Sequence, residues 1–210
     1  MDRNSSMAAV ILIAGGLLAG PGALAQRHEV GLTLGALTGF SRSSPGGSVD
    51  LGACAAFQAN YGFRFLAPKK AALFAEVHFI ASPLREITSP NTTATRDVAT
   101  LYVAPGIRVK FRTASRFSPY VAAGGGYALY EQSLNQLDGR PNPAPRFTHR
   151  GAFAFGGGAD FRLWRFISGR WEVRDFYTGN PSFNTPVSGG GQHNLVASGG
   201  LVLHLGGGEK

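Results

Sequence analysis

Hydrophobic side chains recur at every second position through most of this 210-residue chain, and helical periodicity is weak throughout. In residues 101–111, one parity carries Leu, Val, Pro, Ile, Val and Phe, whereas the other carries Tyr, Ala, Gly, Arg and Lys. Alternation with period two is typical of β-strands that have one apolar and one polar face. It recurs in eight segments and predicts a strand in each of them: 27–37, 49–65, 71–82, 98–112, 118–132, 150–163, 168–177 and 194–205.

The linkers between these segments alternate in length. Four are long and rich in Gly, Pro, Asn, Ser and Thr, namely 38–48, 83–97, 133–149 and 178–193. The three between them, 66–70, 113–117 and 164–167, are short. Tight turns on one side and long loops on the other indicate antiparallel strands connected in an up-and-down order.

The N-terminus has the pattern of an export signal. Residues 7–20 form an apolar run of 14 residues, which is shorter than the roughly 20 residues that a membrane-spanning helix needs. The small-x-small sequence Ala23-Leu24-Ala25 follows, and signal peptidase accepts this pattern. We predict a cleaved signal peptide over residues 1–25, with cleavage before Gln26, and a single domain over residues 26–210. The alternative is a buried N-terminal helix.

The composition narrows the class of partner. The chain has 20 Lys and Arg against 12 Asp and Glu, 30 Gly and one cysteine, Cys54, so it has no internal disulfide. Glycine at this frequency indicates closely packed, strongly curved strands. A formal net charge of +8 can indicate nucleic-acid binding. The export signal argues against a nucleic-acid partner and favours outer-membrane lipids and lipopolysaccharide, whose headgroups and phosphates are anionic.

The same alternation also fits a soluble barrel with its apolar face inward. However, the polar face is mostly Gly, Ala, Gln and Asn with a few charges of both signs, which suits a narrow lumen better than a solvated surface. Aromatic residues also gather near the short linkers, as in an interfacial girdle: Tyr61, Phe63, Phe65, Phe111, Phe117, Trp164, Phe166 and Trp171. We therefore predict an all-β fold, a closed eight-stranded antiparallel up-and-down transmembrane β-barrel. Asp175 falls on the apolar parity, which is tolerable only near the rim or in a bulge.

Four segments carry a family resemblance: SPYVAAGGGY at 118–127, GGGADFR at 156–162, RWEVRDFY at 170–177 and GGLVL at 199–203. With the eight alternating runs, they resemble the OmpA-like eight-stranded outer-membrane β-barrel superfamily over the length of the predicted mature chain. The resemblance implies a bacterial outer-membrane location, insertion by the barrel assembly machinery, and a monomer. The closing residues 205–210 (LGGGEK) depart from the aromatic end that is common in this superfamily.

Charges on the polar parity are expected to meet inside the barrel. Glu172 lies between Arg170 and Arg174 on one face, and an unpaired ion in a filled lumen would cost several kcal/mol. The predicted lumen charge network comprises Glu76, Arg108, Asp160, Arg162, Arg170, Glu172 and Arg174, with Arg64 and Lys110 as further candidates. We interpret it as a plug that holds the lumen shut. The alternative is a gate for small ions in a passive channel.

Basic residues also cluster in the long linkers. Arg140, Arg146 and Arg150, with His149, surround the third long loop, and Arg85 and Arg96 lie in the second. At a cell surface they would bind glycolipid phosphates or an external ligand. The alternative is solvated loop charge.

Some eight-stranded outer-membrane barrels are enzymes that act on lipid A and carry a His-x-Ser motif facing the membrane. The residues two positions after His28, His78, His149, His193 and His204 are Val30, Ile80, Gly151, Leu195 and Gly206, and none is Ser. Pairs of His78 with Glu76, or of His193 with Ser188 or Ser198, stay open. We expect no catalytic residue, no cofactor and no metal site. The expected role is structural or surface interaction, with a small channel and a lipid A-modifying enzyme as alternatives.

Overall fold

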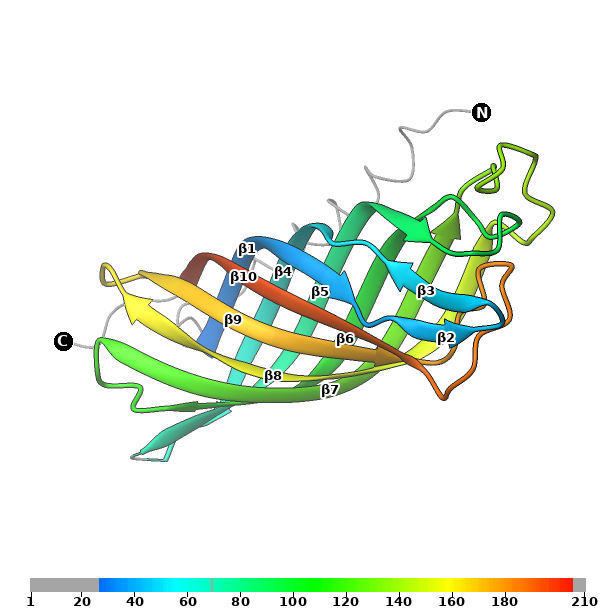
Figure 1. Ribbon diagram of the computed structural model, residues 1–210. Helices are drawn as coiled ribbons and strands as arrows, with labels where there is room; N and C mark the ends of the chain where they lie inside the picture. The colour runs from blue at the N-terminus through cyan, green and yellow to red at the C-terminus, as the bar shows by residue number, and fades with distance from the viewer. Residues whose placement is uncertain (1–26, 69, 206–210) are drawn as a thin grey trace.

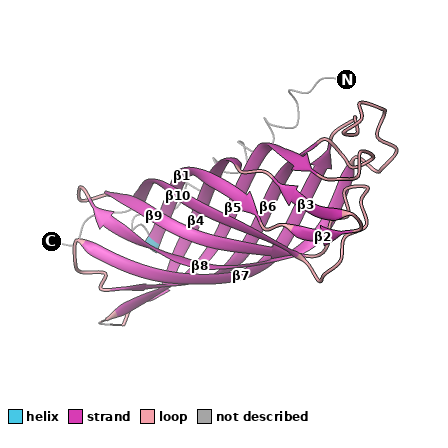
Figure 2. Ribbon diagram, viewed as in Figure 1, coloured by secondary structure: helices cyan, strands magenta, loops and turns pink. Residues whose placement is uncertain are grey.

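The computed structural model describes residues 27–68 and 70–205, and the predicted signal peptide lies outside them. Figures 1 and 2 show a barrel built almost entirely from strands. The strands of the described residues are β1 (His28–Gly39), β2 (Arg42–Ser44), β3 (Gly47–Leu51), β4 (Cys54–Leu66), β5 (Ala71–Thr88), β6 (Asp97–Phe111), β7 (Phe117–Gln132), β8 (Phe147–Arg162), β9 (Ile167–Thr178) and β10 (Gln192–Leu205).

Eight of these strands close into one barrel in the order β1-β4-β5-β6-β7-β8-β9-β10, and β10 returns to β1. Every neighbouring pair is antiparallel, and the closing pair runs from His28↔Leu205 to Gly39↔Asn194. The short turns lie at one end of the barrel and the long loops at the other (Figure 1). The structure confirms the predicted closed eight-stranded antiparallel barrel. Among the described residues, no helix is long and apolar enough to cross a membrane.

The long-loop end is more ordered than the sequence indicated. The first long loop contains the small hairpin β2–β3, and β3 pairs with the end of β5 through Leu51↔Ile87. Strand β5 continues to Thr88 instead of ending at Ser82, with a register shift between Ser82 and Arg85. Pro83 lies at this shift and lacks a backbone N–H, so it interrupts the ladder without ending the strand.

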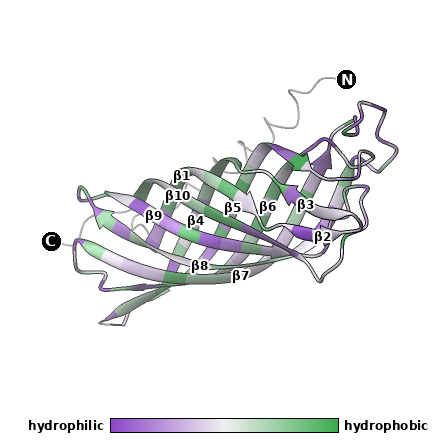
Figure 3. Cartoon of the chain, in the orientation of Figure 1, coloured by the Kyte–Doolittle hydropathy of each residue, from purple (hydrophilic) through white to green (hydrophobic). Residues whose placement is uncertain are grey.

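The outer face of the barrel is apolar and the inner face is polar. Leu32, Phe57, Val121, Phe153 and Leu201 are each more than half exposed on the outside. Figure 3 shows hydrophobic and hydrophilic residues alternating along the strands. A continuous apolar exterior of this extent is rare on water-soluble monomers and is the surface that a lipid-facing barrel requires.

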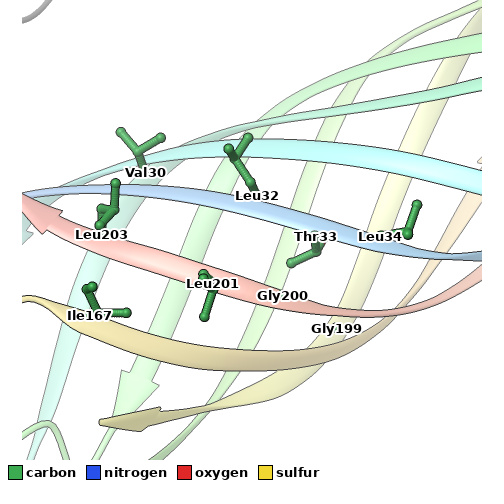
Figure 4. Close-up of a pocket in the computed structure, with 9 residues that line it drawn as sticks. All are labelled: Val30, Leu32, Thr33, Leu34, Ile167, Gly199, Gly200, Leu201 and Leu203. Carbon is green, nitrogen blue, oxygen red and sulfur yellow. The ribbon is translucent and has the colours of Figure 1, made fainter. Parts of the chain in front are cut away.

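A shallow apolar groove crosses the outer wall where β1 meets β10 (Figure 4). Its volume is about 430 Å³, and its lining residues are Val30, Leu32, Thr33, Leu34, Ile167, Gly199, Gly200, Leu201 and Leu203. Gly199 pairs with Leu34 on one side and Trp171 on the other. Because it has no side chain, the wall is hollow between two large apolar residues.

Close packing inside the barrel requires glycine at position 158. A Cβ there would overlap the Trp171 carbonyl oxygen and lie 2.7 Å from the Tyr120 hydroxyl, whereas a Cβ on Gly125 would meet nothing within 4 Å. We expect Gly158→Ala to lower the free energy of unfolding by about 1–3 kcal/mol through overpacking. Gly125→Ala should change it by less than about 0.5 kcal/mol. Urea unfolding of the refolded barrel in lipid vesicles measures both, and equal effects would contradict the close packing.

Candidate functional site

The first cluster of buried charges lies near the short-turn end of the lumen and is centred on Glu29 of β1. The Glu29 carboxylate lies 2.6 Å from Arg108 Nη2, 2.6 Å from Lys110 Nζ and 3.6 Å from Arg170 Nη2. Arg170 holds Asp160 through two hydrogen bonds of 2.7 and 2.8 Å, and Lys110 also contacts Asp160 at 2.7 Å. Such paired, charge-assisted hydrogen bonds are the strong kind.

A second cluster lies further toward the long-loop end, and Arg108 connects it to the first. Arg108 Nε lies 3.2 Å from Glu76, which accepts a 2.6 Å hydrogen bond from Arg174. Glu172 accepts hydrogen bonds from Arg174 Nε at 3.1 Å and from the Tyr120 hydroxyl at 2.7 Å. The network therefore crosses the lumen from wall to wall.

His78 lies between the two carboxylates of this second cluster. Its ring nitrogens are 3.9 Å from Glu76 and 3.7 Å from Glu172, and Nε2 is 2.8 Å from Gln58 Oε1. The pairing of His78 with Glu76 that the sequence left open is therefore a contact inside the closed lumen. Because the His78 side chain is fully buried, this pair has no surface for an external substrate.

The charges of the two clusters balance. Four carboxylates, those of Glu29, Glu76, Asp160 and Glu172, face four cations, those of Arg108, Lys110, Arg170 and Arg174. Aromatic rings also cover the cations, with the Arg108 guanidinium 4.7 Å from the Phe74 ring and that of Arg170 4.9 Å from the Tyr120 ring. Buried ions are tolerated when they are paired in this way.

Six of the seven predicted network residues lie in these clusters, and Arg162 does not lie among them. Arg162 is the last residue of β8, is exposed, and donates to the backbone carbonyl oxygens of Thr113 and Ser115. Its parity is that of the lumen, but it lies at the last position of its strand, at the short-turn rim of the barrel. Arg64 lies half-buried near the end of β4 for the same reason. Glu29, which was missed, stands on the polar parity of the first predicted strand.

Aromatic residues fill the lumen beyond the charged clusters, toward the long loops. Tyr102 packs against Phe176 with ring centroids 5.3 Å apart, and Tyr130 packs against Phe183 at 5.5 Å. Phe183 belongs to the fourth long loop, and Leu51 of β3 joins the same buried cluster. We call this cluster the mouth plug; its full membership is Leu37, Val49, Leu51, Ala56, Ile80, Ile87, Val98, Tyr102, Ala104, Ala128, Tyr130, Ala152, Ala154, Phe176, Phe183 and Val196. Two of the long loops thus fold into the barrel.

The predicted loop arginines differ in the exposure of their side chains and in their hydrogen bonds within the protein. Arg140 lies 3.6 Å from Asp138, with its side chain 80 % exposed. Arg146 donates to Glu131 at 2.9 Å through Nε, and its side chain is 50 % exposed. Arg150 donates to backbone carbonyl oxygens at 2.9 and 3.1 Å. Arg140 and Arg146 are therefore the more accessible cations of the third loop.

Two further arginines lie under the loops. Arg85, which the sequence placed in the second loop, is fully buried because β5 continues past it, whereas Arg96 is exposed. Arg42 of β2 is also buried and donates to Pro181 O at 2.7 Å. Burial lowers the pKa of Arg42 from its ordinary value, and Tyr130 acts in the opposite direction. The mouth of the barrel therefore contains two buried arginines.

Asp175 lies on the outer wall near the long-loop end, three residues before the end of β9. Its carboxylate lies 2.5 Å from His193 Nδ1 and accepts a 3.1 Å hydrogen bond from the Asn194 backbone N–H. The Tyr177 ring packs on His193, with centroids 4.8 Å apart. His193 is thus oriented by a carboxylate at the rim of the wall.

The two serines considered as partners of His193 lie elsewhere. Ser198 is buried on the lumen-facing parity of β10, and the Ser188 backbone N–H donates to Ser43 O within the loops. Within the described part of the chain, no group of three His, Cys, Asp or Glu residues is placed to hold a metal ion.

No family model matches the sequence, and no curated protein matches it. Twenty chains of solved structures do match the fold. Neisserial surface protein A is 14 % identical with a TM-score of 0.55, and the alignment covers 85 % of this chain and 97 % of that one. The outer membrane protein AlkL, solved in lipid bilayers, is 13 % identical with a TM-score of 0.50, covering 91 % and 97 %. The chain therefore has the fold of the eight-stranded outer-membrane β-barrels.

Removing the carboxylate at the centre of the first cluster tests its contribution to stability. Glu29→Gln leaves Arg108 and Lys110 facing a neutral amide, so we expect the free energy of unfolding to fall by about 3 kcal/mol. Glu131→Gln breaks only the exposed pair with Arg146 and should lower it by less than about 1 kcal/mol. Urea unfolding in lipid vesicles gives both values. Similar values for the two variants would show that the buried network does not hold the barrel together.

Proposed function

We propose that the protein is a non-enzymatic component of the bacterial outer membrane, with a structural or surface-interaction role. Its lumen is closed, and its contacts with other molecules are made by the long loops on the cell exterior. The observation that carries this proposal is the lumen itself. Eight paired charges fill the lumen toward the short-turn end, and the mouth plug fills it toward the long loops. The long loops are therefore the surface available for binding another molecule.

The outer-membrane location rests on two supports. The exterior of the barrel is apolar over the height of the wall, and this exterior needs lipid around it. The fold is that of Neisserial surface protein A and of the outer membrane protein AlkL. The predicted signal peptide would supply the export step.

Conductance distinguishes this role from the alternative of a passive channel. The lumen cations contact carboxylates at 2.6 to 3.2 Å, and opening a path would separate them in a space of low dielectric constant. We expect planar bilayers that contain the refolded protein to show no stable steps of porin size. A known porin in the same bilayers is the positive control for conductance. Resistance to unfolding in cold detergent is the control that the protein is folded. Stable porin-sized steps from the folded protein would refute the closed lumen.

The accessible cations of the third loop favour a surface partner with phosphate groups. Arg140 and Arg146 extend into solvent at the long-loop end, and guanidinium groups bind phosphate oxygens through paired hydrogen bonds. Lipopolysaccharide phosphates lie at the height of these loops when the apolar wall spans the membrane. We propose this glycolipid as the surface partner.

Two double variants test whether the third loop binds lipopolysaccharide. We expect the wild-type barrel to bind phosphorylated lipopolysaccharide more tightly than the dephosphorylated form. Arg140→Gln with Arg146→Gln should weaken binding to the phosphorylated form roughly tenfold, which corresponds to about 1.4 kcal/mol. Arg116→Gln with Arg165→Gln removes the same charge from exposed residues at the short-turn end and should have little effect. Equal losses in the two double variants would show that net charge, not the third loop, governs binding.

A further inference from the structure

Arg85 is a fully buried arginine whose hydrogen-bonding groups are only partly used. It lies on β5 just after the register shift, and its side chain is among the largest that are completely buried. Nη1 donates to Asn194 Oδ1 at 2.9 Å. Nε and Nη2 have no hydrogen-bond acceptor among the described residues. Two of the three nitrogen atoms of this buried guanidinium therefore have no hydrogen-bond partner among the described residues.

The charge of Arg85 also has no counterpart. An arginine stays protonated in a protein interior, and the four carboxylates of the lumen are already matched by four other cations. No ion pair of Arg85 occurs among the residues that the structure describes. An orphan buried charge costs several kcal/mol, and a negative charge beside this side chain would remove that cost.

Gly39, Leu51 and Gln192 lie close to the Arg85 guanidinium. A Cβ on Gly39 would lie 2.7 Å from Arg85 Nη2, 3.0 Å from Gln192 Nε2 and 3.0 Å from Leu51 Cβ. The side chains are therefore closely packed around Gly39, and a Cβ at this position would collide with Arg85 Nη2. Leu51, from the mouth plug, is itself buried here.

The Gln192 amide does not replace the missing anion. Its Nε2 donates to Phe40 O at 3.0 Å and to His193 O at 2.8 Å, which fixes the orientation of the amide. Its Oε1 lacks a partner among the described residues, and a neutral amide oxygen next to Arg85 would satisfy a hydrogen bond without balancing the charge.

We propose that Arg85 binds a monovalent inorganic anion of about the size of chloride through Nε and Nη2. The site is buried and bordered by Gly39 and Leu51, which favours a small anion over a phosphate group or an organic acid. The anion would join β1, β3, β5 and β10 where the first and fourth long loops leave the wall. Halide binding is thereby a stabilising element of the mouth plug, and it does not depend on the proposed surface partner.

The test compares salts at equal ionic strength on the refolded full-length barrel. In halide at ten times its dissociation constant, the equilibrium constant for folding should be roughly tenfold larger than in sodium gluconate, whose anion is too large for the site. The effect should saturate with halide concentration. Arg85→Met keeps the length of the side chain without its charge and should abolish the halide effect. Arg146→Met, which removes an exposed cation, should retain it.

A bromide soak of wild-type crystals locates the anion directly. We expect an anomalous peak within hydrogen-bonding distance of Arg85 Nη2. The proposal is overturned if the wild type shows no halide effect, if Arg85→Met keeps an effect of equal size, or if no bromide lies beside Arg85. If Arg85→Met does not fold, the bromide position in the wild type decides alone.

Discussion

Glu29 and Arg108 lie 2.6 Å apart inside a lumen filled by side chains, where little water is present to screen their charges. Each also contacts other ions, Glu29 through Lys110 and Arg108 through Glu76. The resulting network joins β1, β5, β6, β8 and β9. A slip of one residue in any of these strands would turn its charges toward lipid, so the ion pairs fix the register of the five strands that carry them.

The lipid-facing wall does not distinguish one strand register from another in this way. Leu32, Phe57 and Leu201 face a uniform apolar solvent in which one outward residue is nearly equivalent to the next. Discrimination between registers must therefore come from the interior. There, Gly158 admits the Tyr120 ring beside Glu172, and close packing and charge pairing act on the same few positions.

The periodicity of the sequence was enough to predict the eight barrel strands, because alternation is a local property and each strand shows it. It also placed six of the seven predicted network charges in the lumen, although it missed Glu29. It could not predict partners, since Glu29 and Arg108 are 79 positions apart and parity does not determine which strands become neighbours. Arg162 was placed in the lumen because its parity is correct, but parity does not show where the wall ends.

The same limit explains why Arg85 was assigned to a loop. Pro83 begins a segment rich in Pro, Asn, Ser and Thr, which indicates the end of a strand. Only the long-range pairing of β5 with β3 and β6 keeps the first part of that segment in the sheet. Phe183 likewise gave no local sign that it enters the barrel. Loop conformation at the mouth depends on contacts between distant segments, which a periodic pattern does not encode.

Asn194 connects the two faces of the wall at this mouth. Its Oδ1 accepts a hydrogen bond from Arg85 inside the barrel, and its backbone N–H donates to Asp175 on the outside. Asp175 is tolerated on the apolar parity because His193 and this N–H satisfy its carboxylate near the rim. The short-turn half of the barrel is thus neutralised by the chain alone. At the long-loop end, the buried arginine and the outward acid are held by one residue on opposite faces of a single strand. Asp175 therefore does not neutralise Arg85 within the lumen.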